Sequence, residues 1–140
     1  MSLSAIQELA LKETSEYFEG DPLAPDVFLK YALRDLGGNL LETNPDQMHR
    51  RLAKEFARIE SKYPNPLKEQ EIYEHFKGFG DIVPQGSPMS GVGNPYQIQS
   101  LSNCFVIDSP QDSYGGILFT DQEQVQIMKR RGGVGFDVSN

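Results

Sequence analysis

Apolar residues recur with the period of an α-helix through the first half of the chain. The clearest apolar stripe has spacings of four, four and three and consists of Met48, Leu52, Phe56 and Ile59. Asn44 and Pro45 precede this stripe, where a helix has its N-cap and its first residue. Weaker stripes occupy residues 2–19, 25–33 and 67–78. The pattern therefore predicts four helices before residue 84.

Short polar residues, prolines and glycines mark the ends of these helices. Ser2 or Ser4 is expected to cap the first helix, and Pro25 fits the first turn of the second, where its missing N–H costs nothing. Turn-forming residues at 20–22, 34–39 and 63–66 separate the helices. We expect this half of the chain to be a helical platform.

The helix that follows Pro45 has a basic face opposite its apolar stripe. This face carries His49, Arg50, Arg51, Lys54 and Arg58. We expect these side chains to be solvated or paired with the many carboxylates of the chain, and His49 to be a surface residue instead of a metal ligand. His75 has no metal-ligating companion at helical spacing, so we expect no metal site there either.

The second half of the chain combines turn formers with short apolar runs. Residues 84–103 hold so many glycines, prolines and serines that we expect a loop instead of a helix. Cys104 begins an apolar run of β-forming residues that ends before Asp108, which predicts a short buried strand. Another strand is expected to start at Gly133.

A helix is expected between these two strands, over residues 121–131. Thr120 and Glu123 fit a capping box at its start. At its end, Lys129, Arg130 and Arg131 complement the negative end of the helix dipole. Gly132 is expected to take the left-handed conformation that often follows a helix.

Composition narrows the class of protein. The 140 residues carry a net charge of −7, with a pI near 4.8, which argues against a partner such as DNA or RNA. One cysteine cannot form an internal disulfide, and with two histidines it offers no zinc site. No apolar run reaches membrane-spanning length, and the start lacks the features of a signal peptide. We therefore expect a cytoplasmic protein that does not contact membranes.

The loop before Cys104 is the candidate functional stretch. Glycine, serine and asparagine let a backbone approach a ligand closely and offer short polar groups, so an anionic ligand near the thiol is one interpretation. A merely structural loop and a structural cysteine are the alternatives. Redox chemistry would need a second thiol or an external partner, and this chain contains no second thiol. Neither the P-loop signature nor the dinucleotide-binding fingerprint is present, because residues 91–95 lack a third glycine and residues 133–135 follow a predicted helix.

Taken together, two glycine-rich signatures resemble a known family. The sequence GSPMSGVGNPYQIQSLSNCFVID, followed by DSYGGI and by KRRGGVGFDVSN, resembles the amino-terminal part of the catalytic large subunit of ribonucleotide reductases, and the likeness extends from residue 27 to residue 140. It implies a mainly α amino-terminal domain at residues 1–83. Residues 84–140 would then be the first strands of a ten-stranded α/β barrel. We accordingly expect a fragment of a larger fold, inactive alone.

The resemblance also implies roles for five residues of this chain. Cys104 would supply a hydrogen equivalent to the ribose 2′ position and end in a disulfide with a downstream cysteine. Ser87 would contact the substrate phosphate, Asn103 would approach the substrate beside the cysteine, and Gly133 would lie close to the substrate, in the run of glycines at 132–135. Asp112, after a one-residue shift, would contact the ribose of an allosteric dNTP at a subunit interface.

Cofactors and partners follow from the same resemblance. This piece is expected to bind no cofactor. The complete enzyme would use adenosylcobalamin, which the pattern around Cys104 favours, or a metal-radical small subunit. Expected partners are a ribonucleotide substrate, the remainder of the reductase chain, a second copy in a homodimer and a thioredoxin-type reductant. The alternatives are a non-catalytic nucleotide-binding or regulatory module derived from a reductase, and an unrelated α+β domain with a structural cysteine.

Overall fold

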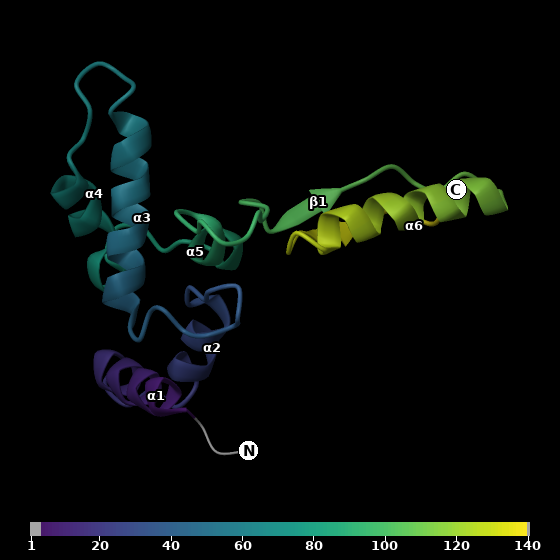
Figure 1. Ribbon diagram of the computed structural model, residues 1–140. Coiled ribbons are helices and arrows are strands. Elements are labelled where there is room, and N and C mark those ends of the chain that lie inside the picture. Colours follow the sequence, from purple (N-terminus) through teal and green to yellow (C-terminus); the bar gives the residue numbers. More distant parts are fainter. Residues whose placement is uncertain (1–3, 140) are drawn as a thin grey trace.

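The computed structural model describes residues 4–139 and consists of a helical body and a narrow arm that extends from it (Figure 1). The elements in chain order are α1 (Ala5–Tyr17), α2 (Ala24–Tyr31), α3 (Pro45–Glu60), α4 (Glu69–Phe76), the 3-10 helix η1 (Lys77–Phe79), α5 (Gly86–Gly91), β1 (Cys104–Val106), α6 (Tyr114–Met128) and β2 (Gly133–Gly135). The described part of the chain is thus mainly helical with one small sheet, as the sequence predicts at this coarse level. None of its helices combines the length and apolar character of a membrane span.

The four helices expected before residue 84 are all present, with the expected caps. Ser4 closes a capping box with Gln7 at the start of α1. Pro25 lies in the first turn of α2, and Asn44 Oδ1 accepts a hydrogen bond from the Gln47 N–H at 3.1 Å at the start of α3. Local sequence therefore decides where these helices begin.

The core of the body lies around α3. Met48 and Leu52 are fully buried, while Phe56, further along the same stripe, stays 41% exposed. Helix α4 packs against α3, and α1 packs against α2 (Figure 1). The buried apolar cluster draws on these helices and on the segments between them; its members are Ala10, Phe28, Ala32, Leu40, Met48, Leu52, Ala53, Ile72, Tyr73, Phe76 and Val92.

An ion pair inside the body holds the segment between α2 and α3 against α5. Arg51 Nε donates to Glu42 Oε1 at 2.6 Å, and both side chains are nearly buried. The same guanidinium donates to the carbonyl oxygens of Met89, at 2.6 Å, and Val92. Arg51 was expected to be solvated or paired, and it is paired in the interior. Its contacts satisfy carbonyl groups at the end of α5.

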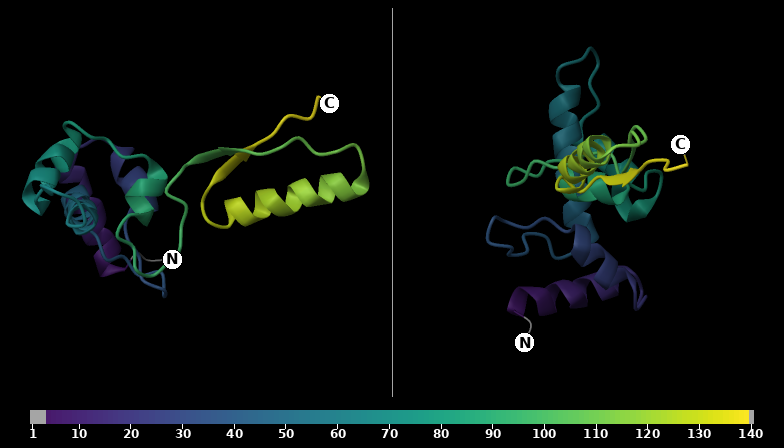
Figure 2. Two further views of the ribbon diagram at one scale, coloured as in Figure 1. Left: turned by 90° about the horizontal axis from the view of Figure 1, so that it is seen from above. Right: turned by 90° about the vertical axis from the view of Figure 1, so that its right-hand side faces the viewer.

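The arm is a β-α-β unit that stands away from the body (Figure 2). Strands β1 and β2 pair in parallel, with Phe105 opposite Val134, and α6 connects them. Phe105 packs toward α6, but Cys104 and Val106 point to the other face, where Val106 is 91% exposed. The prediction of a buried strand is therefore wrong for the described residues, because two short strands and one helix cover only one face of the sheet.

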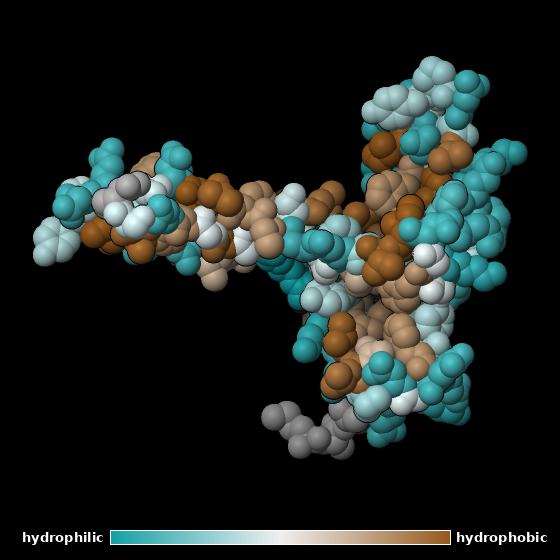
Figure 3. All heavy atoms as spheres, turned by 180° about the vertical axis from the view of Figure 1, so that it is seen from behind, coloured by the Kyte–Doolittle hydropathy of each residue, from teal (hydrophilic) through white to brown (hydrophobic). Residues whose placement is uncertain are grey.

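Apolar surface continues along the outside of α6. Leu118, Phe119 and Val125 are more than half exposed, and apolar side chains are visible along the arm in Figure 3. The buried residue of α6 is a polar one, Thr120. Parallel sheets normally have both faces covered by other elements. The exposed apolar side chains of the arm are of the kind that such covering elements would bury.

The prediction of a loop throughout residues 84–103 is wrong for residues 86–91, which form α5. Residues 86–91 form a short helix despite two glycines and a proline. Pro88 lies in its first turn, where a missing N–H costs no hydrogen bond, and the Met89 N–H donates to the Gln85 carbonyl at 2.9 Å. A Cβ on Gly86 would lie 2.4 Å from the Tyr31 ring, so glycine allows α5 to pack closely on α2.

Helix α6 begins earlier than the sequence pattern indicates. It starts at Tyr114 instead of Asp121, because Ser113 Oγ accepts a hydrogen bond from the Gly116 N–H at 3.0 Å and acts as the N-cap. Thr120 lies within the helix and caps nothing. Arg131, with φ of 68°, takes the left-handed conformation predicted for Gly132. Gly132 is needed for space instead, since a Cβ there would lie 2.8 Å from the Phe105 ring.

Two adjacent glycines of α6 provide a test of this helix start. A Cβ on Gly115 meets open space, whereas a Cβ on Gly116 would lie 2.6 Å from the Gln111 carbonyl oxygen. We expect Gly115→Ala to stabilise the arm by about 0.5–1 kcal/mol, because alanine favours the helix. Gly116→Ala should destabilise it by about 1–3 kcal/mol, because the 111–113 backbone must move. Amide hydrogen exchange of α6 measures both; equal protection in the two variants would contradict the described helix start.

Candidate functional site

Asn103 ties α5 to the start of β1. Its Oδ1 atom accepts a hydrogen bond from the Ser87 N–H at 2.7 Å, and its Nδ2 atom donates to Gln85 Oε1. Its carbonyl oxygen accepts the Gly133 N–H at 2.6 Å. One residue therefore contacts both the helix within the candidate loop, α5, and the strand after α6, β2.

Cys104 follows directly and is exposed. In the parallel register it lies opposite Gly133, which has no side chain, so no side chain of the neighbouring strand covers the thiol from that position. Asn103, which contacts Ser87 and Gly133, is its chain neighbour. The structure thus gathers four of the five candidate residues, namely Ser87, Asn103, Cys104 and Gly133, around the beginning of β1.

Ser87 is buried, and its two donor groups are engaged within the chain. Its N–H donates to Asn103, as described above, and its Oγ–H donates to the Arg131 carbonyl oxygen at 3.4 Å. A phosphate that binds Ser87 would have to take the place of one of these acceptors. The longer bond, to the Arg131 carbonyl, is the one that exchanges more easily.

Asp112 lies apart from the other four residues. It lines a hollow of about 340 Å³ at the start of α6, together with Pro110, Ile117 and Phe136. Cys104 and the end of α6 lie at the other end of the arm. Since α6 has 15 residues, the two ends are separated by roughly 22 Å at about 1.5 Å per residue. Asp112 is therefore unsuited to the chemistry at Cys104 and suited to a separate site.

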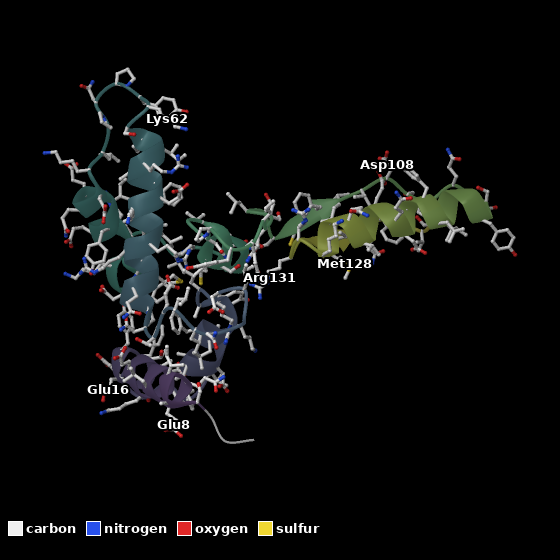
Figure 4. The ribbon with its side chains drawn as sticks, in the orientation of Figure 1. Glu8, Glu16, Lys62, Asp108, Met128 and Arg131 are labelled. Carbon is white, nitrogen blue, oxygen red and sulfur yellow. The ribbon has the colours of Figure 1, made fainter. Side chains whose placement is uncertain are left out.

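A basic cleft lies where the arm meets the body, and sequence reasoning missed it. The cleft has a volume of about 870 Å³. Its cationic lining residues are Lys30, Arg34, Lys129, Arg130 and Arg131. Figure 4 labels Arg131 at this junction. A smaller hollow of about 410 Å³ over Ser87 shares Lys30, Ser90 and Arg131 with it. No spacing in the sequence signals this cluster, because its two halves lie about 100 residues apart, as in the Arg131–Lys30 hydrogen bond.

His49 corrects another prediction, because it is buried instead of exposed at the surface. Its side chain has no exposed area, and neither ring nitrogen has a hydrogen-bond partner among the described residues. The ring packs edge-on against Phe79, with centroids 4.5 Å apart, and stacks on Phe76. Burial lowers the pKa of His49 from its ordinary value of 6.5, although the carboxylates of Asp46 and Glu42 oppose this shift.

This buried ring predicts a pH dependence of stability. Because the pKa of His49 is lower in the folded state, the unfolded chain binds more protons as the pH falls below 6.5. Stability should therefore fall on acidification from 6.5 down to the folded-state pKa, with a slope of at most about 1.4 kcal/mol per pH unit. The free energy of unfolding, obtained from urea titrations at several pH values, gives this slope. In His49→Phe this component should vanish; an unchanged slope would show that other groups cause it.

The described residues contain no group of three or more His, Cys, Asp or Glu side chains that could hold a metal ion. What they define is a mainly helical protein with a parallel β-α-β arm, an exposed thiol at the base of that arm and a basic cleft beside it. Comparison with protein-family models, with curated proteins and with solved structures finds no match to this chain.

Proposed function

We propose that this chain is the amino-terminal part of the catalytic subunit of a ribonucleotide reductase, with Cys104 as one of the redox-active thiols. The observation that carries the proposal is the gathering of Ser87, Asn103 and Gly133 around the exposed Cys104. The family resemblance assigns substrate contacts to these residues. They come from three segments of the sequence, and the fold brings them to one end of β1.

The chemistry that Cys104 would perform is a two-electron reduction. The ribose C2′–OH bond breaks and the hydroxyl leaves as water, while a C2′–H bond forms. Cys104 and a second thiol, outside these residues, give up two hydrogen equivalents and become a disulfide. A cysteinyl radical, also outside these residues, removes the 3′ hydrogen at the start and returns it at the end. An exposed thiol at a strand end suits this role, since it must reach both the ribose and its partner thiol.

The arm supports the proposed architecture. In a ten-stranded α/β barrel, β1, α6 and β2 would be the first strand, crossover helix and second strand, with residues 1–83 as the preceding helical domain. The exposed side chains of Val106 and Leu118 would then be covered by other barrel elements. Because the remaining catalytic groups lie outside these residues, the 140 residues alone should not reduce a nucleotide.

Asp112 would serve regulation instead of chemistry. Its position at the far end of α6 suits contact with a dNTP effector at the interface of a homodimer, away from the thiol. We assign to no residue of this chain the task of holding a radical cofactor, whether adenosylcobalamin or a metal-radical subunit. A thioredoxin-type reductant would restore the thiols. A free cysteine of this kind is maintained in the reducing cytoplasm, where we place the protein.

The proposal is tested on the native protein, captured from source cells with an antibody raised against this chain. We expect a product several times heavier than 15.7 kDa, or a complex of that size, that converts ribonucleotides to deoxyribonucleotides with dithiothreitol as reductant. Without reductant, differential alkylation should find Cys104 oxidised after one turnover. Captured protein that binds nucleotides, forms no deoxyribonucleotide and keeps Cys104 reduced would instead identify the non-catalytic module.

A further inference from the structure

The basic cleft has a charge opposite to that of the chain as a whole. The protein carries a net charge of −7, yet the cleft is lined by five cationic side chains and by no carboxylate. The lining comes from the end of α2 and the turn after it, from Ser90 of α5, from residues 94–99, and from residues 129–131. Cations gather in an acidic protein against mutual repulsion, so such a cluster is favourable where an anion neutralises it.

Most cations outside the cleft are paired with carboxylates, although Lys54, Lys62 and Lys68 have no such partner among the described residues. Among the described residues, Lys12, Arg50, Arg51, Arg58 and Lys77 form ion pairs with carboxylates. None of the five cleft cations has such a partner within the described part of the chain. Helix dipoles favour Lys30, in the last turn of α2, and the cations that follow α6 at residues 129–131. They do not explain Arg34, or why the cationic ends of two helices meet in one cleft.

Contacts to the backbone hold two of these cations in place. Arg34 donates to the carbonyl oxygens of Gly38, at 3.0 Å, and Leu29, at 3.2 Å. Arg131 donates to the carbonyl oxygen of Lys30 at 3.4 Å, and its backbone has the left-handed φ of 68° that long side chains rarely adopt. The Arg130 carbonyl accepts the Ser100 N–H at 2.9 Å, which joins the two walls of the cleft. The guanidinium groups of Arg34 and Arg131 are therefore positioned before any ligand arrives.

The other wall of the cleft offers neutral groups. Asn94, Gln97 and Gln99 supply amide donors and acceptors, and the half-exposed ring of Tyr96 lies among them. A volume of about 870 Å³ falls in the range typical of small-molecule sites. Several clustered cations suit several linked phosphates, and an aromatic ring with amides suits a base. A long nucleic acid does not fit, because the acidic remainder of the surface would repel it.

We propose that this cleft binds a small polyphosphate anion of the size of a nucleoside triphosphate. The site is separate from the hollow at Asp112 and does not depend on the chemistry proposed for Cys104. Through Lys30, Ser90 and Arg131 it adjoins the hollow over Ser87, so an occupant would contact both the body and the base of the arm.

The test is calorimetric titration of the 140-residue chain with inorganic tripolyphosphate, with ATP and with adenosine at low ionic strength. We expect saturable one-to-one binding of tripolyphosphate and ATP, weakened by added salt, and no binding of adenosine. Equal affinities would identify the phosphates as the recognised group. A higher affinity for ATP than for tripolyphosphate would indicate that the adenosine part also contacts the wall at residues 94–99.

Two double variants with equal charge change separate a site from a general charge effect. Lys129→Gln with Arg130→Gln removes two cleft cations and should raise the Kd for tripolyphosphate at least about tenfold. Lys54→Gln with Lys62→Gln removes two exposed cations outside the cleft and should leave the Kd unchanged. The proposal is overturned if wild type shows no saturable binding, if both variants lose affinity equally, or if poly-glutamate binds as well as tripolyphosphate. Circular dichroism melts confirm that each variant is folded.

Discussion

Replacing Cys104 with serine is expected to abolish ribonucleotide reduction by the captured native protein, a loss on the order of 10³-fold or more in turnover. Serine has nearly the same size but cannot give up a hydrogen equivalent to form a disulfide. This chain contains no second cysteine that could take over the role. Because Cys104 is exposed and packs no core, the substitution should leave the melting temperature nearly unchanged. Activity and stability are measured on the same preparation.

Ser102→Ala is the matched control for this substitution. Ser102 is exposed and lies on the same segment, two residues from Cys104, so its replacement should change neither turnover nor stability. If Cys104→Ser keeps full turnover, Cys104 is not a redox thiol and the reductase proposal loses its main support. If both variants lose turnover together, the loss reflects the shape of the loop instead of the thiol.

Arg51→Met should destabilise the protein by about 3–5 kcal/mol. Glu42 is almost completely buried, and the substitution leaves its carboxylate without the guanidinium that it faces at 2.6 Å. One hydrogen bond, from the Leu33 N–H at 2.9 Å, would remain to that carboxylate. The carbonyl oxygens of Met89 and Val92 would also lose their donor, so α5 should loosen from α3. Urea unfolding gives the free energy, and hydrogen exchange of α5 reports the local effect.

The surface pair of Arg58 and Glu55 is the control for the buried pair. It has similar geometry, with a distance of 2.6 Å, but is substantially exposed, and Arg58→Met should leave stability nearly unchanged. A double variant, Arg51→Met with Glu42→Met, should recover most of the loss, because no charge is then left unpaired in the interior. If the double variant is no more stable than Arg51→Met, the buried carboxylate is not the source of the cost.

Arg51 also links stability to the candidate site. It holds the end of α5, and Asn103 holds its beginning through the Ser87 N–H. Helix α5 has six residues, too short to be stable without such contacts. The position of Ser87 relative to Cys104 therefore depends on a residue of α3 that has no contact with either.

Helix positions in the body were predictable because their signals are local. Asn44 and Pro45 define the start of α3 by interactions within one turn, and the period of Met48 and Leu52 selects the buried face. The start of α6 was predicted wrongly because two local signals competed. Thr120 and Ser113 can both cap a helix, and the choice of Ser113 puts Thr120 inside α6. The glycines of α5 favour a loop in the sequence pattern, whereas the helix observed there is stabilised by contacts with α2 and α3.

Sequence pattern predicted the mainly helical class, the order of a strand, a helix and a strand, and the start of β1 at Cys104, since all three depend on residues close together in the chain. Contacts across the fold established the rest: the burial of His49 and Arg51, the meeting of Ser87 with Asn103, and the basic cleft. These features join residues separated by up to about 100 positions, as between Lys30 and Arg131. No periodicity encodes such distances, because they follow from how helices pack.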